Sequence, residues 1–260
     1  MNRVREVQYM RPDEVVAARE AGAPIFLPVG PLEWHGPHLP LGVDPLRAYQ
    51  AALALARELN GLVLPTLFVG TERERSPEML RNIGFAGDEH VEGMDFPQCT
   101  LKSLYFREEV FAGLLRDYLA MLIDGWQFRR IVIVNGHGGE NHIAVIQRLL
   151  TEYNARTQSR VTLVQPMSHY PSSAIGHATV EETETLMLFY PDSVDLGALP
   201  PRPEPLENLR FAVVDDASFN GRSTTHAVCE EADPRKADPA HGREVWDETI
   251  RELKALLERE

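Results

Sequence analysis

The sequence predicts an α/β fold with a mostly parallel central sheet. Short apolar runs rich in β-branched residues alternate with longer stretches of helical periodicity along much of the chain. The strongest strand signal, RIVIVNG at 130–136, lies between two helical patterns. Potentially reactive polar residues gather directly after three of the apolar runs, and parallel strands of α/β sheets bind ligands at their carboxyl ends. We expect residues 1–260 to form a single domain.

The N-terminal half predicts a helix, a strand, a second helix and a second strand in turn. Pro12 suits the first turn of a helix, and Asp44 followed by Pro45 suits the start of the next helix. Both strands are short apolar runs of the kind that is buried in a sheet. In chain order, these elements are expected at 12–21, 24–30, 45–59 and 62–69.

The C-terminal half continues the same alternation. Apolar residues at helical spacing predict helices at 108–126, 141–157, 180–190 and 243–260. Strands are expected at 130–136 and 160–167. The segments 70–105 and 192–240 show no regular pattern, and a long irregular segment such as 70–105 usually serves function or assembly.

Composition excludes several classes of protein. The formal net charge is -13 and the basic residues are scattered, so we expect no nucleic-acid partner. No apolar run approaches the ~18 residues that a membrane-spanning helix needs. The first ten residues, MNRVREVQYM, lack the apolar stretch of a signal peptide. We therefore expect a cytoplasmic protein without a membrane partner.

The first polar cluster, PLEWHGPHLPLGVD, follows the strand at 24–30. Glu33 and His35 are two residues apart, which places both side chains on one side of an extended chain. A carboxylate beside an imidazole suits Zn or Mn, although so short a motif is more often an ordinary polar loop. Asp44 is locally best explained as a helix N-cap, but its two oxygens could also bridge two metal ions.

The second cluster follows the strand at 130–136 and centres on His137. The surrounding glycines permit close approach of the backbone, and a histidine presented by such a turn favours a functional interpretation. Glu140 could stabilise the N-terminus of the next helix by its charge or could be a metal ligand. The residues alone favour neither role.

The third cluster lies in GHATVEET, before the helix at 180–190. Thr179 and Glu182 have the spacing of a capping box, which explains Glu182 without any function. His177 is either a loop histidine or a catalytic group, and local sequence does not separate the two.

Two stretches, LPVGPLEWHGPHLPLGVD (27–44) and VIVNGHGGEN (132–141), resemble the creatininase (creatinine amidohydrolase) family. GHATVEETETLML (176–188) and ADPAHGR (237–243) are also similar to family segments. The resemblance implies a three-layer α/β/α sandwich with two divalent metal ions, Zn or Mn. It further implies hydrolysis of a C–N bond in a small-molecule amide, often cyclic, by a homo-oligomer that is commonly a hexamer.

The resemblance also implies roles for individual residues. Asp44 matches a bridging metal ligand, and His177 matches a histidine of the catalytic pocket. The family has a glutamate two residues after the histidine that His137 matches, where this chain has Gly139. Glu140 completes the site only if the loop holds one extra residue, and Glu182 is the competing candidate. The metal ligands implied directly are Glu33, His35, Asp44 and His137.

Departures from the family pattern leave the substrate open. Trp34 stands where the family often has Gln, and Thr179 and Glu184 replace a Gly and a Ser of the third segment. The family includes formamide hydrolases and a peptidase, so the resemblance favours a reaction class over any one substrate. The alternatives are hydrolysis of another bond, such as a lactone, and a non-catalytic, metal-bound oligomeric binding protein.

Overall fold

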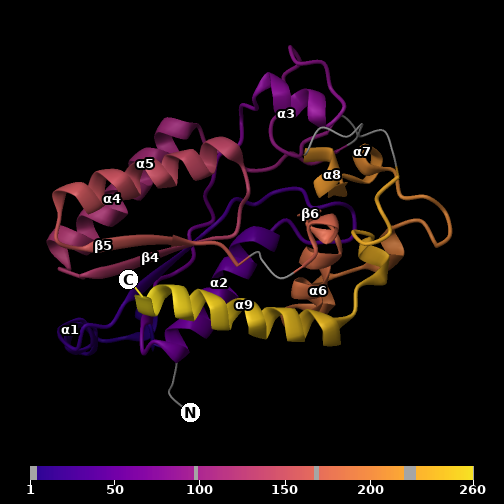
Figure 1. Ribbon diagram of the computed structural model, residues 1–260. Coiled ribbons are helices and arrows are strands. Elements are labelled where there is room, and N and C mark those ends of the chain that lie inside the picture. The colour runs from indigo at the N-terminus through magenta and orange to yellow at the C-terminus, as the bar shows by residue number, and fades with distance from the viewer. Residues whose placement is uncertain (1–4, 97–98, 167–169, 220–226, 260) are drawn as a thin grey trace.

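A five-stranded parallel sheet forms the centre of the computed structural model, which describes residues 5–96, 99–166, 170–219 and 227–259. The strand order is β1-β3-β2-β4-β5, and every neighbouring pair is parallel. Helices cover both faces, which confirms the three-layer α/β/α prediction (Figure 1). The strands are β1 (Arg5–Glu6), β2 (Ile25–Val29), β3 (Leu62–Val63), β4 (Arg130–Asn135) and β5 (Arg160–Val164).

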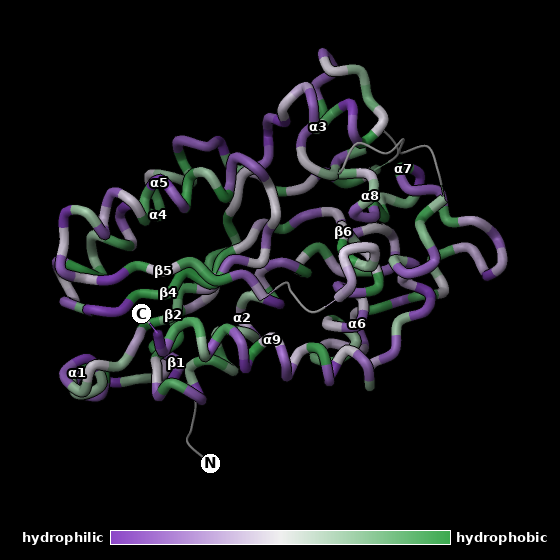
Figure 2. Tube along the Cα trace, viewed as in Figure 1, coloured by the Kyte–Doolittle hydropathy of each residue, from purple (hydrophilic) through white to green (hydrophobic). Residues whose placement is uncertain are grey.

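The sheet is buried on both faces because successive side chains of each strand enter different cores. Ile131 and Ile133 of β4 pack with α4 (Glu108–Ala120) and α5 (Glu140–Arg156). Val132 and Val134 pack on the opposite face. The helices there are α2 (Val43–Glu58) and α9 (Pro239–Arg259), whereas α1 (Pro12–Glu20) packs into the same core as α4 and α5. Figure 2 accordingly shows the central strands in green, while the outer helices carry hydrophilic residues.

Smaller elements lie beyond the carboxyl ends of the central strands (Figure 1). They include a two-stranded antiparallel sheet of β6 (Gly176–His177) and β7 (Val214–Asp215). The helices of this region are α3 (Pro77–Asn82), α6 (Val180–Phe189), α7 (Asn208–Phe211) and α8 (Asp216–Phe219). Short 3-10 turns occur at Val7–Tyr9, Ser172–Ala174, Pro191–Ser193, Leu196–Ala198 and Pro234–Lys236, and a π-helical turn at Met121–Gly125 follows α4.

The observed elements differ from the predicted ones mainly at their ends. The strand expected at 62–69 shrinks to β3, after which Leu64 donates a hydrogen bond to the Phe26 carbonyl and Leu67 forms an isolated bridge with Val29. Helix α2 begins at Val43, and α9 begins at Pro239, earlier than expected. The irregular segments 70–105 and 192–240 contain α3, α7, α8 and β7. The predicted ends at residues 167 and 260 lie outside the described residues. No helix in the described ranges is long and apolar enough to cross a membrane.

Gly136 sets how closely β4 approaches α2. A Cβ atom at this position would lie 2.0 Å from the backbone oxygen of Asp44, so no side chain fits. The Gly136 N–H also donates a hydrogen bond of 3.1 Å to the carbonyl of Val29, at the end of β2. The ends of two strands and the start of a helix therefore meet at one glycine.

Replacing Gly136 with alanine should destabilise the protein by about 2–3 kcal/mol, because the added methyl group meets rigid backbone. Gly138→Ala is the matched control, since a Cβ at Gly138 would have no atom within 4 Å. Denaturant unfolding measures both. Equal midpoints for the two variants would show that the contact between β4 and α2 is not tight.

Candidate metal centre

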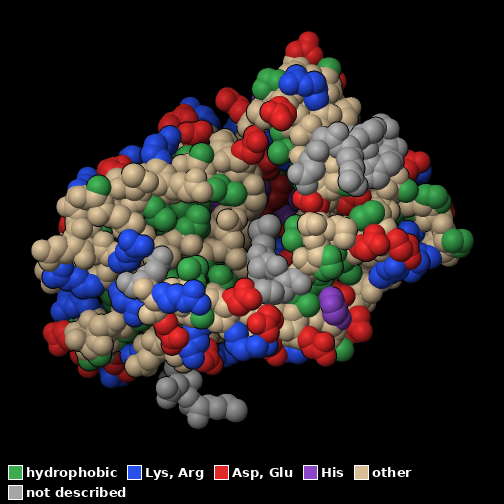
Figure 3. Space-filling model, in the orientation of Figure 1, with side chains coloured by type: hydrophobic (Ala, Val, Ile, Leu, Met, Phe, Trp, Pro, Cys, Tyr) green, Lys and Arg blue, Asp and Glu red, His purple; other side chains and the backbone are tan. Residues whose placement is uncertain are grey.

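A cavity of about 290 Å³ lies beyond the carboxyl ends of β2 and β4. These strands end side by side because Val29 pairs with Asn135 in the sheet register. Figure 3 shows the molecule hollowed at this point, with acidic and histidine side chains inside the hollow. All three sequence clusters contribute to the lining, through Glu33, His137 and His177 among others.

Asp44 lies at the centre of the cluster and faces two imidazoles at once. Its Oδ1 is 3.2 Å from His35 Nε2, and its Oδ2 is 3.0 Å from His137 Nδ1. Glu33 Oε2 lies 3.0 Å from His137 Nδ1, and Glu182 Oε2 lies 3.7 Å from His35 Nε2. The five side chains thus form two groups, each with ligand atoms within 4.8 Å of one another, that share Asp44.

Asp44 is not the N-cap that its local sequence favours. The N-cap of α2 is Gly42, and Asp44 lies within the first turn, where its buried side chain makes no capping bond. The carboxylate turns toward His35 and His137 instead. The tertiary environment therefore determines the direction of this side chain, and the prediction of an N-cap was wrong.

Glu182 joins the cluster, whereas Glu140 stays outside it. Glu182 is buried in the first turn of α6, and its Oε2 accepts a hydrogen bond of 2.7 Å from the Ala178 N–H. The predicted capping box does not form, because the Thr179 hydroxyl donates to the Ala174 carbonyl. Glu140 is exposed as the first residue of α5, where its charge suits the helix N-terminus.

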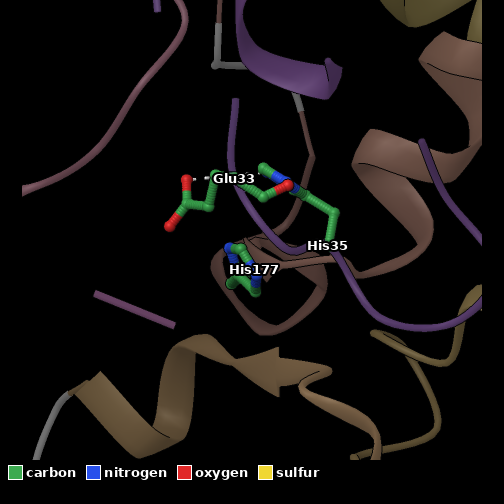
Figure 4. A group of neighbouring side chains, drawn as sticks. All are labelled: Glu33, His35 and His177. Atoms are coloured by element: carbon green, nitrogen blue, oxygen red, sulfur yellow. Dashed lines mark hydrogen bonds and ion pairs between the residues drawn. The ribbon is translucent and has the colours of Figure 1, made fainter. Parts of the chain in front are cut away.

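His177 of β6 lies beside His35, with 4.3 Å between their ring centroids. Figure 4 shows both rings grouped with Glu33, and these three side chains make a third possible ligand group. His177 Nε2 is 2.6 Å from the Trp34 carbonyl, so this nitrogen carries the proton and Nδ1 can accept one. Burial, and then the nearby His35, lower the pKa of His177 well below its usual value.

The buried carboxylates of the cluster favour a bound cation. Burial by itself lowers the pKa of His35, but Asp44 and Glu182 outweigh it and raise the pKa from 6.5 to about 10. Burial also lowers the pKa of His137, but Glu33 and Asp44 outweigh burial and raise this pKa well above its usual value. Buried carboxylates and imidazoles in these two groups are the donors that Zn and Mn prefer, so the residues present fit a divalent metal.

The sequence patterns missed three residues of the irregular segment 70–105. The Tyr105 hydroxyl donates to Glu33 Oε1, and burial together with Glu33 raises the pKa of Tyr105, which keeps the proton in place. Glu72 Oε2 lies 3.6 Å from His137 Nε2, and Arg75 forms an ion pair with Glu72. Glu72 comes three residues after the strand predicted at 62–69, as Glu33 does after the strand at 24–30, so position after a strand could have indicated it. Arg75 and Tyr105 have no such local signal.

Arg47 was also missed, although it lies one turn after Asp44 on the same helix. It is fully buried and pairs with Glu181 and with Glu182, whose Oε1 lies 2.9 Å from Arg47 Nη1. Arginine in the middle of a helical pattern is usually solvent-exposed, so its sequence context did not indicate a buried role. Its role here is to hold Glu182 in place.

Comparison with known proteins agrees with this geometry. The family model described as creatinine amidohydrolase matches residues 8–257. The chain belongs to the creatininase family. One relative in this family is the creatinine amidohydrolase of Pseudomonas putida, 25% identical over 198 residues, or 69% of each chain.

One further relative and one solved structure are also similar to this chain. The mycofactocin precursor peptide peptidase of Mycolicibacterium smegmatis is 27% identical over 214 residues, covering 79% of this chain and 77% of the relative. A crystal structure of creatinine amidohydrolase superposes with a TM-score of 0.69 at 21% identity, covering 99% of this chain and 98% of that chain. The creatininase fold therefore extends over nearly the whole chain.

The metal-free protein should lose stability as the pH rises from 6.5 to about 10. The folded pKa of His35 is raised to about 10, so the stabilisation from its proton is complete below 6.5 and is lost as the pH approaches 10. His137 acts in the same direction. A bound metal replaces these protons, so metal-loaded protein should show a smaller decline in melting temperature. Parallel declines with and without metal would contradict this account.

Proposed function

We propose that the protein is a metal-dependent amidohydrolase that cleaves a C–N bond in a small amide, cyclic amide or formamide. The observation that carries the proposal is the position of Asp44, shared between two ligand groups. Membership of the creatininase family supports it. Solved creatininase structures include a manganese form and a Zn–Zn form, and we propose two such divalent ions here.

Each of the two ligand groups would hold one of the two ions. Asp44 belongs to both groups, so Glu33, His137 and Asp44 would hold one ion, and His35, Glu182 and Asp44 would hold the other. Each ion then has three protein ligands, which leaves positions for water and substrate. A structural site would be closed by a fourth protein ligand, so this count favours catalysis over a binding protein.

Bound divalent ions would lower the pKa of a water molecule and polarise the amide carbonyl. The protein supplies the proton transfers. His177, neutral because of its low pKa and fixed through Nε2 by the Trp34 carbonyl, offers Nδ1 to accept a proton from the attacking water. It then returns that proton to the leaving nitrogen. The backbone N–H groups of Gly138 and Gly139, which line the cavity, stabilise the developing oxyanion.

The cavity limits the substrate to a small molecule. Its volume of about 290 Å³ lies near the lower end of ligand-binding cavities. Met79, Met94 and Phe219 provide apolar walls opposite the polar cluster.

We also propose a homo-oligomer, as the family resemblance implies, because Leu104 and Phe106 expose apolar surface near the site.

Glu182→Gln and Glu140→Gln form a matched pair that tests the ligand assignment. Wild type should bind about two Zn or Mn ions per chain by elemental analysis. Glu182→Gln should lose about one of them, because a neutral amide is a poor ligand, while Glu140→Gln should retain both. The reverse pattern would make Glu140 the ligand.

His177→Gln tests the proton carrier and preserves a donor to the Trp34 carbonyl. We expect full metal content and a kcat roughly 10²- to 10⁴-fold lower on the best cyclic amide or formamide from a substrate screen. A matched lactone should be affected less, since an oxygen leaving group needs less protonation. Loss of metal from this variant would instead identify His177 as a ligand, and a faster wild-type rate on lactones would favour ester hydrolysis.

A further inference from the structure

Arg75 is a buried cation that the proposed mechanism does not use. It lies just before α3, lines the cavity, and has a side chain only 2% exposed. Its Nη2 forms an ion pair of 2.7 Å with Glu72 Oε1. Yet Nε and Nη1 are buried and make no hydrogen bond within the described part of the chain. Buried donors without acceptors are unfavourable, so this guanidinium is suited to a ligand.

Glu72 does not satisfy Arg75 because its carboxylate is divided between two neighbours. Its second oxygen faces His137 Nε2 at 3.6 Å, on the side of the metal cluster. The planar guanidinium fork of Arg75 therefore retains donors for a second carboxylate, and such two-point pairs are specific. The adjoining cavity walls at Met79 and Met94 offer no side-chain charge to compete with such a pair.

We propose that Arg75 binds a carboxylate of the substrate, so that the protein acts on small amides that carry an acidic group. This inference rests on the proposed amidohydrolase function and names its substrate class. A series of close contacts through Glu72 and His137 connects Arg75 to Glu33 and Asp44. The carboxylate and the scissile amide must then be joined by a short linkage, as in a cyclic amide with an acidic substituent.

Calorimetric titration of the Mn-loaded protein with matched ligands tests the proposal. One pair is hydantoin-5-acetic acid and 5-ethylhydantoin, and a second is 5-oxoproline and 2-pyrrolidone. Wild type should bind the acid of a pair roughly 10- to 100-fold more tightly than its neutral partner, the range expected for a charge-assisted pair. For any ligand that is hydrolysed, kcat/KM gives a second readout of the same preference.

Arg75→Gln should abolish the preference for the acid, and Arg75→Lys should keep part of it. Arg73→Gln is the matched control, because Arg73 belongs to the same segment but is 44% exposed and pairs with Glu92. It should retain the full preference. Melting temperature and metal content are measured for every variant, to separate recognition from folding.

Several results would overturn the proposal. If wild type shows no preference, or binds neither member of either pair, Arg75 does not recognise a carboxylate. If the preference survives in Arg75→Gln, the metal ions bind the carboxylate. If Arg75→Gln loses metal and stability but keeps the ratio of affinities, Arg75 serves only as the counter-ion of Glu72. Preferential binding without hydrolysis of any amide would support Arg75 and refute the amidohydrolase function instead.

Discussion

The site depends on one carboxylate held between two imidazoles. Asp44 reaches both His35 and His137 only because Gly136 lets the end of β4 lie directly against the first turn of α2. The next turn of α2 carries Arg47, which faces Glu181 and Glu182 on α6. A buried charge is tolerated only when it is paired, so the start of α2 orients the cluster on one side and anchors α6 on the other.

Three side chains of the site are held by groups outside the cluster. Tyr105 holds Glu33, while Arg47 and the Ala178 N–H hold Glu182. His177 is fixed by the Trp34 carbonyl. Such outer contacts set the direction of metal ligands and limit their freedom before any ion binds. The arrangement is therefore preorganised by the fold.

The sequence predicted the sheet well because strands buried on both faces appear as continuous apolar runs, as β2 and β4 do. Convergence of the strand ends also indicated that Glu33 and His137 would meet. The choice between Glu140 and Glu182 lay beyond sequence, since it depends on where the start of α6 packs. Arg75 and Tyr105 were missed because their segment lacks periodicity, and spatial neighbours far apart in sequence leave no local pattern.

The segment between β3 and α4 supplies a different part of the site from the rest of the chain. The loops after β2 and β4, together with α2 and α6, supply the candidate metal ligands, whereas this segment supplies Arg75 and the walls at Met79 and Met94. Exchange of the segment between relatives would thus change the wall of the cavity and leave the cluster around Asp44 intact. One restriction applies, because the segment also brings Tyr105 to Glu33. A transplanted loop must deliver a hydroxyl to that point, so a single hydrogen bond limits how freely this region can diversify.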